Sequence, residues 1–163
     1  MEYNMVKFKH QPLKQGYNKL RTAGLASKKS ATFGMVRKNK NGTSRAHQGV
    51  DLAVDNGYRC YAVDDGIVVN VSRGLDGYGW TITIKLHSGL YAFYAHLSDI
   101  RVKLNQKVKA GEIIALSGST GNAKGMTTVS KGAHLHFEVR TAMLVGLGLI
   151  GRLNPLDYFD LDE

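Results

Sequence analysis

Hydrophobic and polar residues alternate over short stretches through most of the chain. Residues 81–86 read Thr-Ile-Thr-Ile-Lys-Leu, a period of two that is typical of a half-buried antiparallel strand. Comparable runs predict six strands, at residues 58–63, 66–71, 80–86, 90–96, 112–117 and 134–140. No long amphipathic helix is indicated, and residues 99–106 could form one short helical turn at most. We therefore expect an all-β fold, mainly an antiparallel sheet or sandwich with a groove and few short helices.

Turn residues between the predicted strands support this fold class. The chain has 19 glycines and two prolines, and turn signals occur at residues 64–66, 75–77, 87–89 and 118–125. Residues 38–45 are polar, and we expect a loop there that leads to His47. Residues 143–150 are apolar but too short to span a bilayer. We expect a buried strand or turn at 143–150, with an exposed contact patch as the alternative.

The 163 residues are enough for one domain with a hydrophobic core, but the charge is uneven. Residues 1–45 hold eleven Lys and Arg against the single acid Glu2, whereas residues 46–163 hold eleven against twelve. We expect residues 1–31 to form a basic N-terminal arm that packs loosely on a folded domain of residues 32–163. Such an arm favours anionic partners such as wall polymers, nucleic acid or lipid headgroups; the alternative is a solubilising, partly disordered leader.

Segments that direct export or form disulfides are not evident. Cys60 is the only cysteine, so it cannot form an internal disulfide, and we expect a small core residue there. The first fifteen residues contain no apolar run of the length found in secretory signals. A protein of this kind that acts outside the cytoplasm would be delivered by another route, or its leader is missing from the sequence.

The most informative motif is Ala-His-Leu-His-Phe-Glu at residues 133–138. On a strand, His134, His136 and Glu138 point to one face, and the apolar residues between them point to the other. A second motif, His47-Gln-Gly-Val-Asp51, adds further side chains of the types that bind zinc. A catalytic zinc takes three protein ligands and leaves its fourth position to water, so the two motifs together predict a metal-dependent hydrolytic site.

The order of these motifs resembles the M23 family of zinc metallopeptidases, the lysostaphin-like or LytM-type peptidoglycan endopeptidases. The resemblance runs from about Phe33 to Phe159. It is carried by Phe33-Gly34, His47-x-Gly49-x-Asp51, Tyr61-Ala62, Gly66 with Val68, Gly77-Tyr78-Gly79, Tyr94-Ala95-His96-Leu97, Val108-x-Ala110-Gly111, Ser117-Gly118-Ser119-Thr120-Gly121, His134-Leu135-His136-Phe137-Glu138 and Asn154-Pro155-Leu156-x-Tyr158. It implies that His47, Asp51 and His136 bind one zinc ion and that His96 and His134 are catalytic.

The chemistry of these residues suggests a role for each. His134 lies two residues from His136 on the same strand face, where it could accept a proton from the metal-bound water. His96 ends another strand and could hold the scissile carbonyl oxygen or protonate the leaving amine. Tyr94 shares a strand face with His96 and could contact the oxyanion, although packing beside the groove is an equal alternative. Glu138 is expected to orient a histidine from behind the ligands.

We therefore expect a zinc metalloendopeptidase that hydrolyses peptide cross-links or stem peptides of bacterial peptidoglycan, acting at the cell wall or periplasm. The resemblance supplies the substrate, and the residues themselves support zinc-dependent hydrolysis. The alternative is a non-catalytic wall-binding, phage tail or activator module of the same fold. Nucleotide binding is rejected because the glycines of residues 118–121 lack the Lys-Ser/Thr ending and a following helix. Nucleic-acid binding is disfavoured because the body has no basic stripe.

Overall fold

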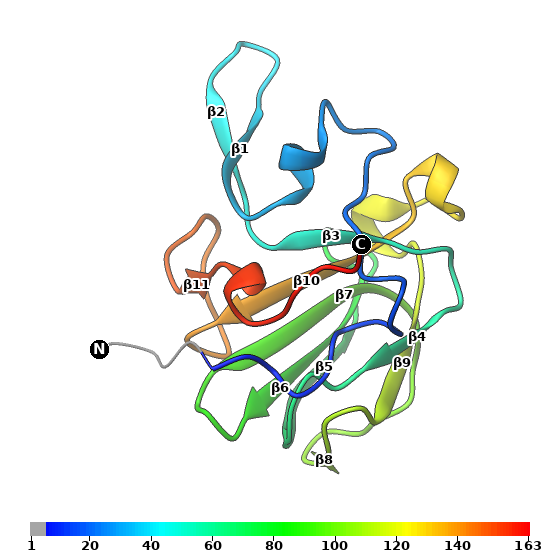
Figure 1. Cartoon of the computed structure of the whole chain (residues 1–163), viewed down its shortest axis with the longest axis vertical. Coiled ribbons are helices and arrows are strands. Elements are labelled where there is room, and N and C mark those ends of the chain that lie inside the picture. Colours follow the sequence, from blue (N-terminus) through cyan, green and yellow to red (C-terminus); the bar gives the residue numbers. More distant parts are fainter. Residues whose placement is uncertain (1–5) are drawn as a thin grey trace.

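The computed structural model describes residues 6–163 and confirms an all-β fold (Figure 1). Its helices are short 3-10 turns, and no α-helix occurs within the described residues. The strands are β1 (Gly34–Lys38), β2 (Ser44–His47), β3 (Val50–Ala53), β4 (Arg59–Tyr61), β5 (Gly66–Arg73), β6 (Trp80–Leu86), β7 (Tyr91–Ile100), β8 (Lys107–Val108), β9 (Ile113–Ser117), β10 (His134–Arg140) and β11 (Arg152–Leu153). The 3-10 turns are η1 (Lys28–Ala31), η2 (Gly121–Ala123), η3 (Val129–Lys131) and η4 (Pro155–Asp157). None of the helices in this part of the chain is long and apolar enough to cross a membrane.

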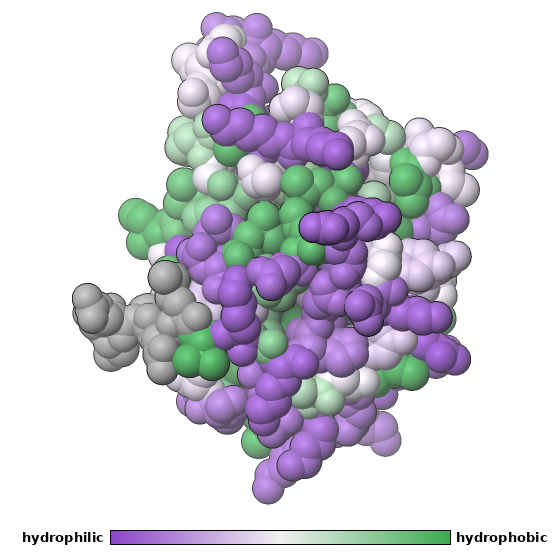
Figure 2. All heavy atoms as spheres, in the orientation of Figure 1, coloured by the Kyte–Doolittle hydropathy of each residue, from purple (hydrophilic) through white to green (hydrophobic). Residues whose placement is uncertain are grey.

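One antiparallel sheet carries nine strands, and β10 lies inside it, between strands that pair with both of its edges. The central path runs β11-β10-β7-β6-β5-β8, and β9 pairs with both β4 and β7. Along one edge β10 pairs with β3 and then with β11, and along its other edge it pairs with β7. The remaining two strands, β1 and β2, form a separate hairpin that projects from the sheet at the top of Figure 1. On the face shown in Figure 2 the outer end of this hairpin is mostly hydrophilic.

The predicted strands agree with the structure best where alternation is strong. β6 and β10 have the predicted bounds, and β7 runs on to Ile100, through the start of the stretch where a helical turn was considered. Residues 38–45 do not form a loop throughout, because β1 and β2 pair across them as a hairpin. The prediction of a buried strand or turn at residues 143–150 is wrong in its burial, since Leu147 is 92% exposed on a loop.

The hydrophobic core lies beneath the face of β10 opposite its histidines. Leu135, Phe137 and Val139 are all buried there, together with Ile82 and Ile84 of β6. Burial of such side chains stabilises the fold by about 1.5–3 kcal/mol each. Cys60 is fully buried in this core, as predicted. A packed sheet on this side holds the backbone beneath the histidines rigid.

The N-terminal segment packs closely, which corrects the expectation of a loose arm for residues 6–31. Leu13 is 1% exposed and pairs with Cys60 in an isolated β-bridge, and Leu20 pairs with Leu52 in the same way. Phe8 stacks on Tyr158 with ring centroids 5.3 Å apart. In Figure 1 this segment, drawn in blue, crosses the front of the sheet. Apolar residues spaced irregularly along an extended segment give no periodic signal, so the packing was not apparent from the sequence. Residues 1–5 lie outside the described residues.

Candidate metal centre

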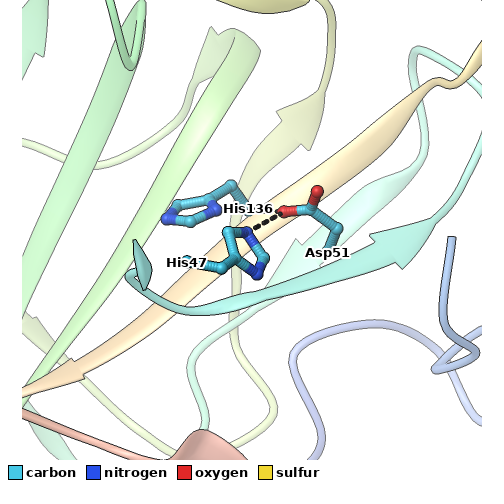
Figure 3. Close-up of side chains that lie close together, drawn as sticks. All are labelled: His47, Asp51 and His136. Carbon is cyan, nitrogen blue, oxygen red and sulfur yellow. Dashed lines mark hydrogen bonds and ion pairs between the residues drawn. The ribbon is translucent and has the colours of Figure 1, made fainter. Parts of the chain in front are cut away.

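His47, Asp51 and His136 converge at one point between β2, β3 and β10 (Figure 3). One potential ligand atom from each lies within 4.8 Å of the others. Oδ1 of Asp51 is 3.0 Å from Nε2 of His47 and 3.0 Å from Nδ1 of His136. All three residues are buried. The sequence predicted these three as ligands, and the structure brings their ligand atoms together.

Strand register explains how residues 85 positions apart meet. β3 and β10 pair antiparallel with Asp51 directly opposite His136, so their side chains share one face. Gly49 lets the chain between His47 and Asp51 pass close to β10. A Cβ at Gly49 would collide with the carbonyl oxygen of Phe137, so a residue with a side chain cannot occupy this position without moving the strand.

The second ring nitrogen of each ligand-type histidine is held by a fixed acceptor. Nδ1 of His47 donates to the Thr32 carbonyl at 2.8 Å, so Nε2, which lies 3.0 Å from Oδ1 of Asp51, is the nitrogen that faces the cluster. Nε2 of His136 lies 2.7 Å from Oε2 of Glu138. Contacts of this kind set the tautomer and ring orientation of metal-binding histidines and raise their basicity. Glu138 therefore contacts one of the two ligand-type histidines, and its role in orienting a metal ligand stays a prediction.

Glu138 is itself part of a buried charged cluster. Its Oε1 accepts hydrogen bonds from Nε of Arg140 at 2.8 Å and Nε of Arg152 at 2.7 Å. Burial opposes ionisation of Glu138, but its contacts with His136, Arg140 and Arg152 outweigh burial and lower the pKa of this carboxyl. Tyr78 stacks on His136, and burial together with Glu138 raises the pKa of its phenol to about 12. The carboxylate is thus held ionised behind the site.

These residues fit a zinc ion. Two imidazole nitrogens and one carboxylate oxygen are a ligand set that zinc takes in proteins. Burial opposes ionisation of Asp51, yet its hydrogen bonds to His136 and His47 hold the pKa well below its usual value. Burial lowers the pKa of His136, but Asp51 and Glu138 overcome this and raise it to about 9. The carboxylates of Asp51 and Glu138 thus stabilise a positive charge at His136, either a proton on the ring or a metal ion beside it.

The two remaining histidines lie beside the cluster. His134 Nε2 is 3.7 Å from Oδ2 of Asp51, and the rings of His96 and His134 meet edge to face with centroids 5.0 Å apart. Nδ1 of His134 donates to the Gly132 carbonyl and Nδ1 of His96 donates to the Thr120 carbonyl, because a carbonyl oxygen can only accept. The Nε2 atom of each ring is therefore free to accept a proton.

Burial keeps both of these rings neutral. It lowers the pKa of His96 to about 3, with help from the neighbouring His134 and His136. Burial also lowers the pKa of His134, against the opposing effect of Asp51. A neutral imidazole with its lone pair on an exposed edge is a proton acceptor, which is the state that general-base chemistry requires.

Tyr94 does not lie at this site, so the prediction of an oxyanion contact is wrong. Its side chain is fully buried on the core face, where the hydroxyl donates to the Tyr61 carbonyl and accepts from the Val63 amide. The cause is an irregularity in β7: its register against β6 gains one residue between Tyr94 and Leu97, and His96 has φ of 59°. A bulge of this kind turns a side chain to the opposite face, so His96 and Tyr94 do not share one.

Two arginines that the sequence analysis did not single out contact the cluster. Nη1 of Arg21 is 3.2 Å and Nη2 of Arg37 is 2.8 Å from Oδ2 of Asp51. Both come from segments without periodicity, so no sequence signal pointed to them. Arg140 did have a signal, since it continues the alternation of His134, His136 and Glu138 on the site face of β10.

The comparisons with known proteins agree with the geometry. Residues 45–146 match the model of peptidase family M23. Over 109 residues the chain is 37% identical to the murein hydrolase activator NlpD of Salmonella dublin, covering 67% of this chain and 27% of that protein. Over 98 residues it is 37% identical to the DD-carboxypeptidase/endopeptidase Mpg of Neisseria meningitidis serogroup B, covering 60% of this chain and 21% of that protein.

A solved structure carries the similarity over nearly the whole chain. A zinc-containing peptidase from Vibrio cholerae superposes with a TM-score of 0.68 at 30% identity, covering 95% of this chain and 40% of that one. The chain spans about a quarter of the length of the curated relatives it matches. The matched segment includes all five residues of the histidine–aspartate site. This chain therefore belongs to peptidase family M23.

Proposed function

We propose that this protein is a zinc-dependent endopeptidase that hydrolyses peptide cross-links or stem peptides of bacterial peptidoglycan. The observation that carries the proposal is the juxtaposition of two kinds of histidine in one site. His47 and His136 share a carboxylate, as metal ligands do, whereas His96 and His134 stand beside them with free Nε2 atoms. The peptidoglycan substrate is inferred from the relatives, one of which is named as a DD-carboxypeptidase/endopeptidase and another as a murein hydrolase activator.

His47, Asp51 and His136 would hold the zinc ion, which supplies an acidified water and polarises the scissile carbonyl. Glu138 accepts a hydrogen bond from Nε2 of His136, so Nδ1 is the nitrogen that would bind the metal. Thr32 does the same for His47 through its carbonyl. The protein thus fixes which nitrogen of each imidazole faces the position of the metal.

His134 is assigned as the general base and His96 as its partner across the site. Nε2 of His134 accepts the proton from the attacking water, while Nδ1 stays bonded to Gly132. His96 enters the reaction neutral, because its pKa is lowered to about 3. His96 can therefore hold an oxyanion or protonate a leaving amine only after its own ring has gained a proton. Because the pKa of His96 is low, the protonated ring is then a strong proton donor.

A non-catalytic activator role is the second candidate, because one relative is named as a murein hydrolase activator. Metal binding alone would serve such a module. His96 and His134 favour the enzyme, since their hydrogen bonds to main-chain carbonyls orient both free Nε2 atoms, and a binding module has no need of that arrangement.

The proposed site of action is the bacterial wall or periplasm, where these relatives suggest that the substrate lies. Binding of an anionic wall polymer by the basic N-terminal segment remains a proposal. Lys7 and Lys9 in that segment form ion pairs with Asp160 and Asp65 at 3.0 and 3.3 Å, so part of its charge is already used within the protein.

Mass spectrometry of peptidoglycan fragments tests the proposal. The purified protein is incubated with isolated wall, with and without a zinc chelator. New amine and carboxyl termini that disappear on chelation would support a zinc endopeptidase and identify the bond. Intact wall after incubation with protein that contains zinc would exclude turnover on that substrate and favour the activator role.

A further inference from the structure

Three arginines line the cavity that contains the histidine–aspartate site. Arg21 lies before η1, Arg37 lies on β1 and Arg45 lies on β2, and all three border the same cavity of about 480 Å³. Among the residues that line this cavity, within the described chain, Asp51 is the only acid. The wall of the site is therefore strongly cationic.

The three guanidinium groups differ in their burial and in how many hydrogen bonds hold them in position. Arg21 is buried, and it donates from Nε to the Ala23 carbonyl as well as contacting Asp51. Arg37 is part-exposed and bonds to the Ser30 carbonyl and to Asp51. Arg45 is exposed, and its side chain has no hydrogen bond or ion pair with any residue that the structure describes. The cavity thus runs from a fixed cation at its base to an open one at its rim.

Arg37 and Arg45 are direct cross-strand partners in the hairpin. Side chains at such a position share a face, and like charges there destabilise the strand pair. The two arginines of this hairpin repel each other beside the cavity. An anion bound between their guanidinium groups would be stabilised by both charges.

The charge balance of the metal-bound site strengthens the case. Asp51 is the only acid for the three cavity arginines, because Glu138 is already shared by two other buried arginines behind the site. A divalent cation at Oδ1 of Asp51 would share this carboxylate with Arg21 and Arg37, which contact Oδ2, so the carboxylate is then divided among three cations. The guanidinium of Arg45 has no acidic partner among the described residues, with or without the cation. In a partly enclosed cavity, such an excess of one sign attracts a ligand group of the opposite sign.

We propose that Arg37 and Arg45 bind a free carboxylate of the substrate beside the scissile bond, so that acidic stem peptides are preferred over neutral glycine bridges. This inference rests on the proposed function and deepens it. A guanidinium matches a carboxylate in shape and forms short, charge-assisted hydrogen bonds. The carboxylate can belong to the side chain of an internal residue or to the C-terminus of the peptide.

Four synthetic peptides separate these sources. The first has a free carboxylate next to the scissile amide and an amidated C-terminus, and the second has only a free C-terminal carboxylate. The third has both groups amidated, and the fourth is pentaglycine amide. With zinc-loaded protein we expect kcat/KM for the first or second to exceed that for the third and fourth by about tenfold or more, the effect of one charge-assisted hydrogen bond.

Arg45→Gln is the variant that tests the arginine, because Arg45 has no contact with the ligand cluster. It should reduce the preference for the carboxylate several-fold, and raised salt should reduce it in the wild type. Lys40→Gln is the matched control: it removes one charge from the same hairpin, but Lys40 does not line the cavity. It should leave the preference unchanged.

Binding to chelator-treated protein gives a readout that does not depend on turnover. Calorimetry should show tighter binding of the carboxylate peptides than of the fully amidated one, and Arg45→Gln should weaken only the former. Equal cleavage of the acidic and amidated peptides would overturn the inference and leave the proposed function intact. If no peptide is cleaved, the proposed function fails on these substrates, and equal binding of all four would then overturn the carboxylate site as well.

Discussion

His136 and Glu138 lie two residues apart on β10, and Nε2 of the imidazole contacts the carboxylate at 2.7 Å. This one contact joins the ligand cluster to a buried salt-bridge cluster, because the other carboxylate oxygen is bonded to Arg140 and Arg152. Alternation along a strand places such residues on one face, so the sequence motif itself encodes the relationship. The arrangement makes Glu138 important for stability as well as for orientation of a ligand.

Glu138→Gln should destabilise the metal-free protein by about 3–5 kcal/mol, since it leaves two buried guanidiniums without their carboxylate. The free energy of unfolding in urea measures this. Glu112→Gln makes the same chemical change at an exposed position and should stay within about 0.5 kcal/mol of the wild type. Equal stability of the two variants would show that the buried cluster adds nothing that a neutral amide cannot replace.

His136→Ala and His134→Ala should separate metal binding from turnover. Loss of His136 removes one of three ligand groups, so zinc content measured by atomic absorption should fall to near background. Loss of His134 leaves all three ligand groups in place and should keep the zinc while reducing kcat by a factor of about 10²–10⁴, the usual contribution of a general base. Equal zinc retention in the two variants would contradict the division between ligand and base.

Tyr94→Phe tests the corrected position of Tyr94. Its hydroxyl bridges the Tyr61 carbonyl and the Val63 amide in the core, so its removal should cost about 1–3 kcal/mol of stability. Because the hydroxyl lies away from the metal cluster, kcat/KM measured well below the melting temperature should not change. A selective loss of kcat with unaltered stability would return Tyr94 to the active site.

Period-two alternation predicted the parts of the site that lie on regular strands. It placed His134, His136 and Glu138 on one face of β10, and the pairing of β10 with β3 brings Asp51 to the same face. Alternation failed at His96, because a bulge in β7 and a positive φ reverse the face that the pattern assigns. Bulges depend on how neighbouring strands pair, which a single strand's sequence does not contain.

The residues that enclose the site were harder to predict for a different reason. Arg21 and Arg37 reach Asp51 from 30 and 14 residues away, out of segments whose apolar positions follow no period. Such contacts depend on the path of the chain over the sheet, and composition indicates only that this end of the chain is basic. The charge that suggested a partner for the N-terminal segment is partly used to line the cavity.

The stability of the wild type relative to Asp162→Asn should depend on pH. Burial opposes ionisation of Asp162, but hydrogen bonds from Gln11, Asn18 and Gly16 outweigh it and lower the pKa to about 2 from 3.8. A carboxyl group with a lowered folded-state pKa stabilises the fold above its unfolded pKa, and this contribution is lost as the pH falls toward the folded value. Urea unfolding at pH 6 should therefore show the wild type to be more stable.

The difference between the two proteins should shrink between about pH 4 and pH 2, where the wild-type carboxylate takes up its proton. Comparing the two proteins at each pH cancels the titration of groups that they share. A difference that stays constant down to pH 2 would show that the hydrogen bonds do not favour the ionised form of Asp162.

Leu13→Ala tests whether the N-terminal segment is part of the folded domain. Leu13 is 1% exposed in the core, so truncation should cost about 2–5 kcal/mol of unfolding free energy. Val6→Ala, in the same segment but at a side chain that is 64% exposed, should change it by no more than about 0.5 kcal/mol. If Leu13→Ala is equally mild, the segment is an appended arm that can be removed without loss of the fold. If the large cost is found, deletion of residues 1–30 will unfold the peptidase domain, and a role for the segment in binding must be tested with surface substitutions such as Lys14→Gln.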